Sequence, residues 1–119
     1  MVTTEDNVIV DKSYRFAVRI VRLCQYLRDE KREYLLSRQL QNSGTSIRAN
    51  VTEGQYGQSR ADFIAKLSIA LKEASETKYW IDLLYDTGYL TEREYRSIQT
   101  DCIEIIKLLT GILKTAKIR

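Results

Sequence analysis

The sequence predicts an all-α protein, an antiparallel up-down-up-down four-helix bundle formed by a single domain over residues 11–119. Three observations lead to this prediction. The 119 residues include no proline and only five glycines, and chains so poor in helix breakers usually form long helices. Apolar residues recur at spacings of three and four along four segments, as on the buried face of a helix. The links between these segments are short, and short links place neighbouring helices antiparallel.

The first helix is expected to begin near Asp11 or Ser13 and to end at about Glu30, after a flexible lead-in over residues 1–10. Its broad apolar face contains Phe16, Ile20, Leu23 and Leu27. The charged run at residues 29–33 has no apolar residue. We therefore expect a turn or a frayed helix end there.

The second helix is expected from about Tyr34 to Glu53, and it carries small and polar residues where bundle helices usually carry leucine. Its apolar stripe consists of Leu36, Leu40, Gly44, Ile47 and Val51. A polar stripe runs beside it and consists of Gln39, Ser43, Ser46, Asn50 and Glu53. Small side chains let neighbouring helices approach closely, and polar groups buried by that approach need partners. Gly54 and Gly57 then indicate a turn.

The third helix is expected to follow an N-cap at Ser59 and to end at about Thr87, where Gly88 stops it. Its heptad seam is small in the middle and consists of Phe63, Leu67, Ala70, Ala74, Thr77, Ile81 and Leu84. The fourth helix is expected after a capping box formed by Thr91 and Glu94. Its heptad positions are Tyr95, Ile98, Cys102, Ile105, Leu109, Ile112 and Ala116.

Several enzyme classes are excluded by the absence of histidine from the chain. Ser-His-Asp and Cys-His catalysis need an imidazole, and so do the Glu-x-x-His pairs of di-iron bundles. Cys24 and Cys102 lie on apolar helical faces without metal-ligand spacing, so buried reduced thiols are favoured over a disulfide or a metal site. We therefore expect a cytoplasmic protein that is not an enzyme and has no cofactor. No segment is typical of a membrane span or a secretion signal.

The basic residues are unevenly distributed, although the net charge is only +3. The antiparallel topology gathers the start of the first helix, the end of the fourth and the turn between the second and third at one end. The residues that we expect to bind nucleic acid there are Lys12, Arg15, Arg19, Arg22, Arg48, Arg60, Lys114 and Lys117. Because no groove-reading helix, zinc finger or RNA-binding motif is present, such binding would be independent of base sequence and sensitive to salt. The alternative is that these charges only keep the protein soluble. The protein would then be a structural or protein-interaction scaffold that does not bind nucleic acid.

The polar motif of the second helix has two interpretations. Asn50 and Glu53 either form hydrogen bonds that fix helix register or an oligomer interface, or Glu53 and Glu76 act as an acid–base pair. The structural interpretation is favoured because no nucleophile or metal ligand accompanies the carboxylates. The aromatic residues Tyr79, Trp80, Tyr85, Tyr89 and Tyr95 are expected to fill a bundle end or a subunit interface. The alternative for these aromatic rings is stacking on nucleobases.

Several motifs occur in order along the chain: Ser46-Ile47-x-Ala49-Asn50-x-x-Glu53-Gly54, Asp62-Phe63, Ile69-Ala70-Leu71, Glu76 and Thr87-Gly88-Tyr89-Leu90. Over about residues 12–117 they resemble the bacterial four-helix-bundle family first noticed as products of intervening sequences inside large-subunit ribosomal RNA genes. The resemblance implies assembly into a ring-like homopentamer. Relatives in that family include the accessory variability proteins of diversity-generating retroelements, which are basic barrels that bind nucleic acid and partner a reverse transcriptase. This chain departs from the family pattern with Gly57-Gln58 in place of a basic pair and with Lys72-Glu73 in place of a glycine-serine pair.

Overall fold

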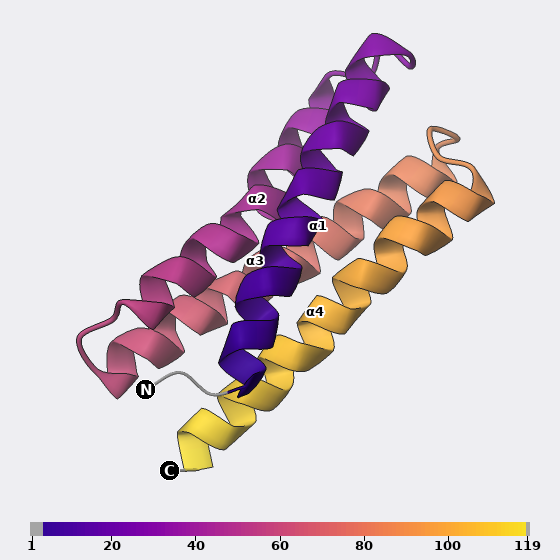
Figure 1. Ribbon diagram of the computed structural model, residues 1–119. Helices are drawn as coiled ribbons and strands as arrows, with labels where there is room; N and C mark the ends of the chain where they lie inside the picture. The colour runs from indigo at the N-terminus through magenta and orange to yellow at the C-terminus, as the bar shows by residue number, and fades with distance from the viewer. Residues whose placement is uncertain (1–3, 119) are drawn as a thin grey trace.

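The computed structural model describes residues 4–118, and residues 1–3 and 119 lie outside the described part. Four helices account for nearly all of it: α1 (Thr4–Asp29), α2 (Leu35–Gln55), α3 (Arg60–Asp86) and α4 (Glu92–Ile118). The helices alternate in direction and pack against one another as an elongated bundle (Figure 1). The predicted all-α four-helix fold is confirmed, and the observed helix ends of α2, α3 and α4 agree with the expected ones to within about two residues.

The first helix begins earlier than its sequence pattern predicts. α1 is already helical from Thr4, so the expected lead-in over residues 1–10 and the start near Asp11 are wrong as far as the structure describes this segment. Ser13 is buried and donates its hydroxyl hydrogen to the carbonyl oxygen of Ile9 at 2.6 Å. This is a bond inside a helix and not an N-cap. Ile9 is fully buried, and its burial explains why the helix extends upstream.

The core follows the predicted seams, and its centre is built from small side chains. The buried members are Leu40, Ser43, Gly44, Ile47 and Val51 on α2, Leu67, Ala70, Ala74, Thr77, Ile81 and Leu84 on α3, and Ile98, Cys102, Ile105, Leu109 and Ile112 on α4. Gly44 allows α2 to approach α1 closely, because a Cβ atom there would lie 2.8 Å from Cγ2 of Ile20. On the other side of α2, the hydroxyls of Ser43 and Thr77 meet across the interface with α3.

Two of the predicted helix-terminal signals have the expected geometry. Gly88 adopts a φ of +87° and the amide of Tyr89 donates to the Leu84 carbonyl at 2.9 Å, which is the Schellman arrangement that ends α3. The backbone amide of Thr91 donates to the Glu94 carboxylate at 2.8 Å, and the backbone amide of Glu94 donates to the Thr91 hydroxyl at 3.1 Å. This reciprocal pair is the capping box that starts α4.

The start of α2 is stabilised by a residue that the sequence pattern places in a turn. Glu33 is buried, and its carboxylate accepts hydrogen bonds from the backbone amides of Leu35, Leu36 and Ser37 at 2.7–3.2 Å. These amides are the unpaired donors of the first helical turn, where a negative charge is favourable. Arg32 precedes it with a φ of +55°, a left-handed conformation that reverses the chain between α1 and α2.

Candidate nucleic-acid interface

The start of α1, the end of α4 and the α2–α3 turn lie at the same end of the bundle (Figure 1). The turn between α1 and α2 and the turn between α3 and α4 lie at the other end. α1 and α4 diverge toward that second end (Figure 1). Of the expected basic residues, Lys114 and Lys117 near the end of α4 and Arg60 at the start of α3 therefore belong to the first end. Arg19 and Arg22 lie farther along α1.

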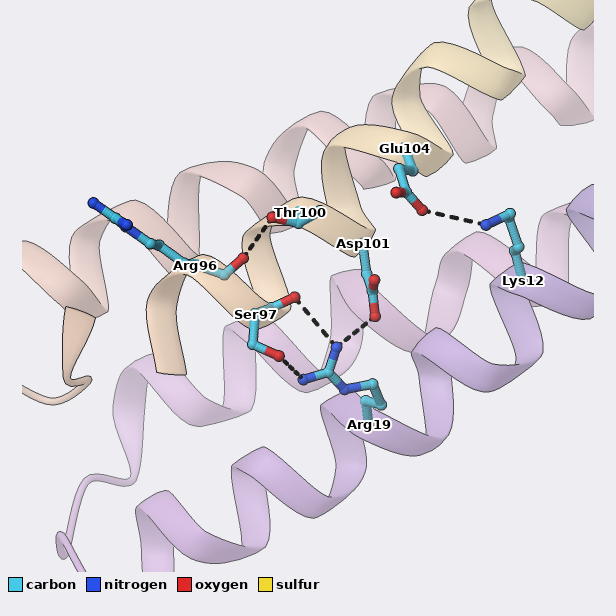
Figure 2. A network of polar contacts seen from close by, with 7 residues as sticks. All are labelled: Lys12, Arg19, Arg96, Ser97, Thr100, Asp101 and Glu104. Atoms are coloured by element: carbon cyan, nitrogen blue, oxygen red, sulfur yellow. Dashed lines mark hydrogen bonds and ion pairs between the residues drawn. The ribbon is translucent and has the colours of Figure 1, made fainter. Parts of the chain in front are cut away.

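Two of the expected cations are bound to carboxylates between α1 and α4. Arg19 forms an ion pair with Asp101 and donates to the carbonyl and hydroxyl oxygens of Ser97 at 3.3 and 2.8 Å (Figure 2). Lys12 lies 3.2 Å from a carboxylate oxygen of Glu104. Both pairs join residues far apart in the sequence. Their positive charges are therefore partly neutralised inside the chain, and the two pairs link α1 with α4.

The other two expected cations of α1 differ from each other. Arg15 pairs with Asp11 of the same helix at 3.2 Å, and both side chains are largely exposed. Such an exposed pair within one helix is weak. Arg22 is exposed and forms no ion pair with another residue in the described part of the chain. Arg22 is thus the residue of the predicted α1 stripe whose charge is least compensated.

Arg48 is held in place without losing its charge. Its guanidinium donates to the Thr52 hydroxyl at 2.8 Å and to the Val10 carbonyl at 3.2 Å. It also lies over the Tyr14 ring, 5.3 Å from the centroid, in a cation–π arrangement. All three partners are uncharged, so the side chain is ordered while its positive charge remains available to an external anion.

At the end of the bundle, Lys114 and Lys117 are exposed and have no ion pair with another described residue. Arg60 is exposed as well and takes part in an interaction within the chain. Of the eight expected residues, Lys12, Arg15 and Arg19 are paired with carboxylates. Arg22, Arg48, Lys114 and Lys117 have no such pair among the described side chains of residues 8–118, and Arg60 takes part in an interaction within the chain. A pattern along one helix cannot show which of its cations meet a carboxylate of another helix, as Lys12 and Arg19 do.

The residues of the polar motif make local contacts within this chain. Asn50 donates its amide to the Ser46 carbonyl of its own helix at 2.9 Å, and Glu53 lies 3.8 Å from Lys66 on α3. Glu76 is exposed and lies about 15 Å farther along the α3 axis than Lys66, so Glu53 and Glu76 do not form a pair. Gly54 is buried where a Cβ atom would lie 2.5 Å from Cδ1 of Leu67. Its role is therefore close packing of α2 against α3.

A polar cluster on α3 and α4, which the sequence pattern does not reveal, surrounds Asp82. Its carboxylate accepts hydrogen bonds from the Tyr95 hydroxyl at 2.6 Å and from the Gln99 amide at 2.9 Å, and Lys78 lies at 3.3 Å. Burial tends to raise the pKa of Asp82, but the hydrogen bonds from Tyr95, Gln99 and Lys78 outweigh it, and the net shift is downward. The hydrogen bond to Asp82 raises the pKa of Tyr95. The cluster joins the two helices at the end where they are linked by a turn.

The aromatic residues near the α3–α4 turn pack mainly against the bundle. The rings of Tyr85 and Tyr95 stack with their centroids 4.2 Å apart, and Tyr79 meets Trp80 edge-on at 4.9 Å. Tyr85, Tyr89, Tyr95 and Trp80 are partly buried against the core, whereas Tyr79 is exposed. The predicted filling of a bundle end is thus seen for this cluster within one chain.

The two cysteines are buried and unbridged. Burial raises the pKa of Cys24 to about 11 and that of Cys102 to about 12. Each thiol lies near a main-chain carbonyl, Cys24 near Ser37 and Cys102 near Ala74. Among the described side chains, those of residues 8–118, no group of three metal-ligating residues comes together.

The comparison with known proteins gives the family. The chain matches the 23S rRNA-intervening sequence protein over residues 5–111. The chain belongs to that family.

A similar crystal structure extends this result to the fold. It is a protein with unknown function from the S23 ribosomal protein family of Bacteroides thetaiotaomicron. The two chains are 55% identical and superpose with a TM-score of 0.92, covering 93% of this chain and 99% of the other. The resemblance drawn from the motifs is therefore confirmed at the level of family and fold. No curated protein matches the chain, and none of its described helices is long and apolar enough to span a membrane.

Proposed function

We propose that this protein is an oligomeric accessory factor without catalytic activity that binds nucleic acid non-specifically through its basic end. The observation that supports the proposal is the set of cations without a carboxylate partner among the described residues, above all Arg48, Lys114 and Lys117. Arg48 is the strongest of them, because neutral partners fix its position and leave its charge uncompensated. A guanidinium held in this way can bind a phosphate with little loss of side-chain entropy.

The mechanism is charge neutralisation with release of counterions from the phosphate backbone. Arg22 and Arg60 extend the surface, whereas Lys12, Arg15 and Arg19 contribute less because Glu104, Asp11 and Asp101 partly neutralise them. The family resemblance implies a ring of five copies. In such a ring, the effective concentration of neighbouring patches would strengthen the weak contacts of one patch by multivalency.

The experiment is a salt series of binding to a short DNA duplex and to an RNA of generic sequence, read by fluorescence anisotropy. We expect the logarithm of affinity to fall linearly with the logarithm of salt concentration. The Lys114→Gln/Lys117→Gln variant should reduce the slope by about 0.9 on duplex DNA for each lost phosphate contact. Arg96→Gln is the matched control, because Arg96 is an exposed cation at the opposite end of the bundle. Absence of binding at low salt, or equal effects of the two variants, would refute the proposal.

The competing function is that of a structural or protein-interaction scaffold without nucleic-acid binding. Several large apolar side chains on the surface favour it: Leu35 is 76% exposed, Tyr56 84% and Ile118 85%. Analytical ultracentrifugation tests the assembly common to both functions, and a monomer at micromolar concentration would contradict the ring. A ring that binds neither DNA nor RNA at low salt would favour the scaffold.

A further inference from the structure

A second cationic site lies at the other end of the bundle, where α1 meets the start of α2. Arg28, Tyr34, Arg38, Gln41 and Asn42 line a surface pocket of about 280 Å³, close to the lower limit of ~300 Å³ for small-molecule sites. None of these residues belongs to the basic end described above. The pocket combines two guanidinium groups, two side-chain amides and one aromatic ring.

Arg28 is fixed in the wall of this pocket by an uncharged partner. Both terminal nitrogens of its guanidinium donate to Oε1 of Gln41, each at 3.1 Å. The acceptor is an amide oxygen and not a carboxylate, so the positive charge is retained. This bond also occupies the acceptor of Gln41 and leaves its amide nitrogen as a donor.

No carboxylate lines the pocket, although acidic residues are close in sequence. Glu33, between the two helices, has its oxygens bound by three backbone amides at the start of α2. Arg38 is exposed and makes no polar contact with another described residue. The pocket therefore contains two guanidinium groups that are not paired with a carboxylate among the described residues, and it is rich in hydrogen-bond donors, which is the chemistry that binds an oxyanion.

The ring of Tyr34 in the pocket wall adds a preference for a ligand with an aromatic base to the preference for an anion. Tyr34 is 50% exposed and lines the pocket beside Arg38 and Asn42. An exposed aromatic ring next to arginine is the usual platform for a stacked nucleobase. The Asn42 amide supplies a donor and an acceptor that suit the edge of a base.

We propose that this pocket binds a nucleotide through its phosphomonoester, with the phosphate on Arg28 and Arg38 and the base against Tyr34. This chemistry is shared by free mononucleotides and by the phosphorylated end of an oligonucleotide. The proposal is independent of the binding proposed for the basic end, because the two sets of residues lie at opposite ends of the bundle.

The test is a titration of the ¹⁵N-labelled full-length protein with adenosine monophosphate, followed by the backbone amide shifts. We expect the shifts to concentrate at residues 28–42 and to saturate. Arg38→Gln should weaken binding by about tenfold or more, since a charge-assisted hydrogen bond is lost. Arg96→Gln, which removes an exposed arginine near the α3–α4 turn at the same end of the bundle, should leave the affinity unchanged.

Two further ligands distinguish the contribution of the phosphate to binding from that of the base. Adenosine, which lacks the phosphate, and inorganic phosphate, which lacks the base, should each bind at least about tenfold more weakly than the nucleotide. Equal binding of adenosine and the nucleotide, shifts scattered outside residues 28–42, or equal effects of Arg38→Gln and Arg96→Gln would overturn the proposal. Because the Arg38 side chain is exposed, the Arg38→Gln variant is expected to fold, which a thermal melt checks.

The source of the phosphate is decided by comparing one oligonucleotide with and without a 5′ phosphate, at a salt concentration that suppresses backbone binding. Tighter binding of the phosphorylated form, abolished by Arg38→Gln, assigns the pocket to nucleic-acid ends. Binding of the mononucleotide alone assigns it to free nucleotides. Failure of all phosphorylated ligands at this pocket refutes the inference and leaves the function proposed for Arg48 and Lys114 untouched.

Discussion

The hydroxyl of Thr77 donates a 2.9 Å hydrogen bond to the hydroxyl of Ser43 across the α2–α3 interface. Both side chains are almost completely buried. Each hydroxyl also lies near a carbonyl of its own helix, Leu40 for Ser43 and Glu73 for Thr77. The pair therefore satisfies two buried polar groups inside the α2–α3 interface.

Removal of either hydroxyl should weaken the bundle. We expect Ser43→Ala and Thr77→Val each to lower the free energy of unfolding by about 1 kcal/mol, because one buried partner is left unpaired. The double variant should cost less than the sum of the single variants by about 0.5–1 kcal/mol, since both remove the same bond. Urea unfolding measures all four proteins, and strict additivity would show that the two hydroxyls do not interact.

Gly44 and Gly111 should respond in opposite ways to alanine. Gly44→Ala is expected to destabilise the protein by about 1–3 kcal/mol, because the new Cβ would lie 2.8 Å from the stiff side chain of Ile20. Gly111 is exposed inside α4 with open space around it. Gly111→Ala should therefore stabilise by about 0.5–1 kcal/mol through helix propensity alone. Melting temperatures that move in the same direction would contradict the close packing of α1 and α2.

The contact between Asp82 and Tyr95 should make stability depend on pH at both extremes. The pKa of Asp82 is lowered in the fold, so its contribution is present above the unfolded pKa of about 4 and is lost as the pH falls through the folded value. The pKa of Tyr95 is raised, so its contribution is present below about pH 10 and is lost as the pH rises further. Tyr95→Phe should cost about 1 kcal/mol at neutral pH.

The same variant should also move the pKa of Asp82 upward, because the carboxylate loses one hydrogen-bond donor. Titration of the Asp82 carboxyl carbon by NMR measures this shift. Tyr56→Phe is the control, since Tyr56 is 84% exposed in the α2–α3 turn. An unchanged Asp82 pKa in the Tyr95 variant would show that the hydrogen bond is not maintained in solution.

The cysteines should be unreactive in the native protein. With pKa values of about 11 for Cys24 and about 12 for Cys102, the thiolate fractions at pH 8 are only ~0.1% and ~0.01%. Burial restricts access further. We expect a thiol reagent such as DTNB to react fully only after unfolding, and denatured protein is the positive control. Rapid reaction in native buffer would indicate that α1 or α4 opens locally.

Asp101→Asn should increase the affinity for nucleic acid under the proposed function, because it releases the positive charge of Arg19. Its effect on stability should be small, about 0.5 kcal/mol, since both side chains are about 40% exposed. Glu92→Gln is the matched control, because it removes an exposed carboxylate that pairs with Arg96 at the other end. A larger gain in affinity from the control than from Asp101→Asn would exclude a role for the α1 stripe.

The fold could be predicted because its signals are local. The heptad seams of α3 and α4 and the signals at Gly88 and Thr91 depend on residues within a few positions of one another, and the same backbone chemistry acts wherever they occur. The start of α1 was missed for a related reason. Serine is a preferred N-cap residue, so Ser13 suggests a helix start. Only the burial of Ile9 and the hydrogen bond from Ser13 to its carbonyl show that the helix continues upstream.

The sequence by itself determined the helices, their order, the small centre of the core and the family to which the chain belongs. The tertiary structure decided which charges remain available. Arg19 and Asp101 are separated by 82 positions, and Arg48 meets Val10 across 38. Whether a cation is neutralised by a carboxylate or only held by a carbonyl depends on contacts between helices, and a pattern read along one helix contains no information about the side chains of its neighbours.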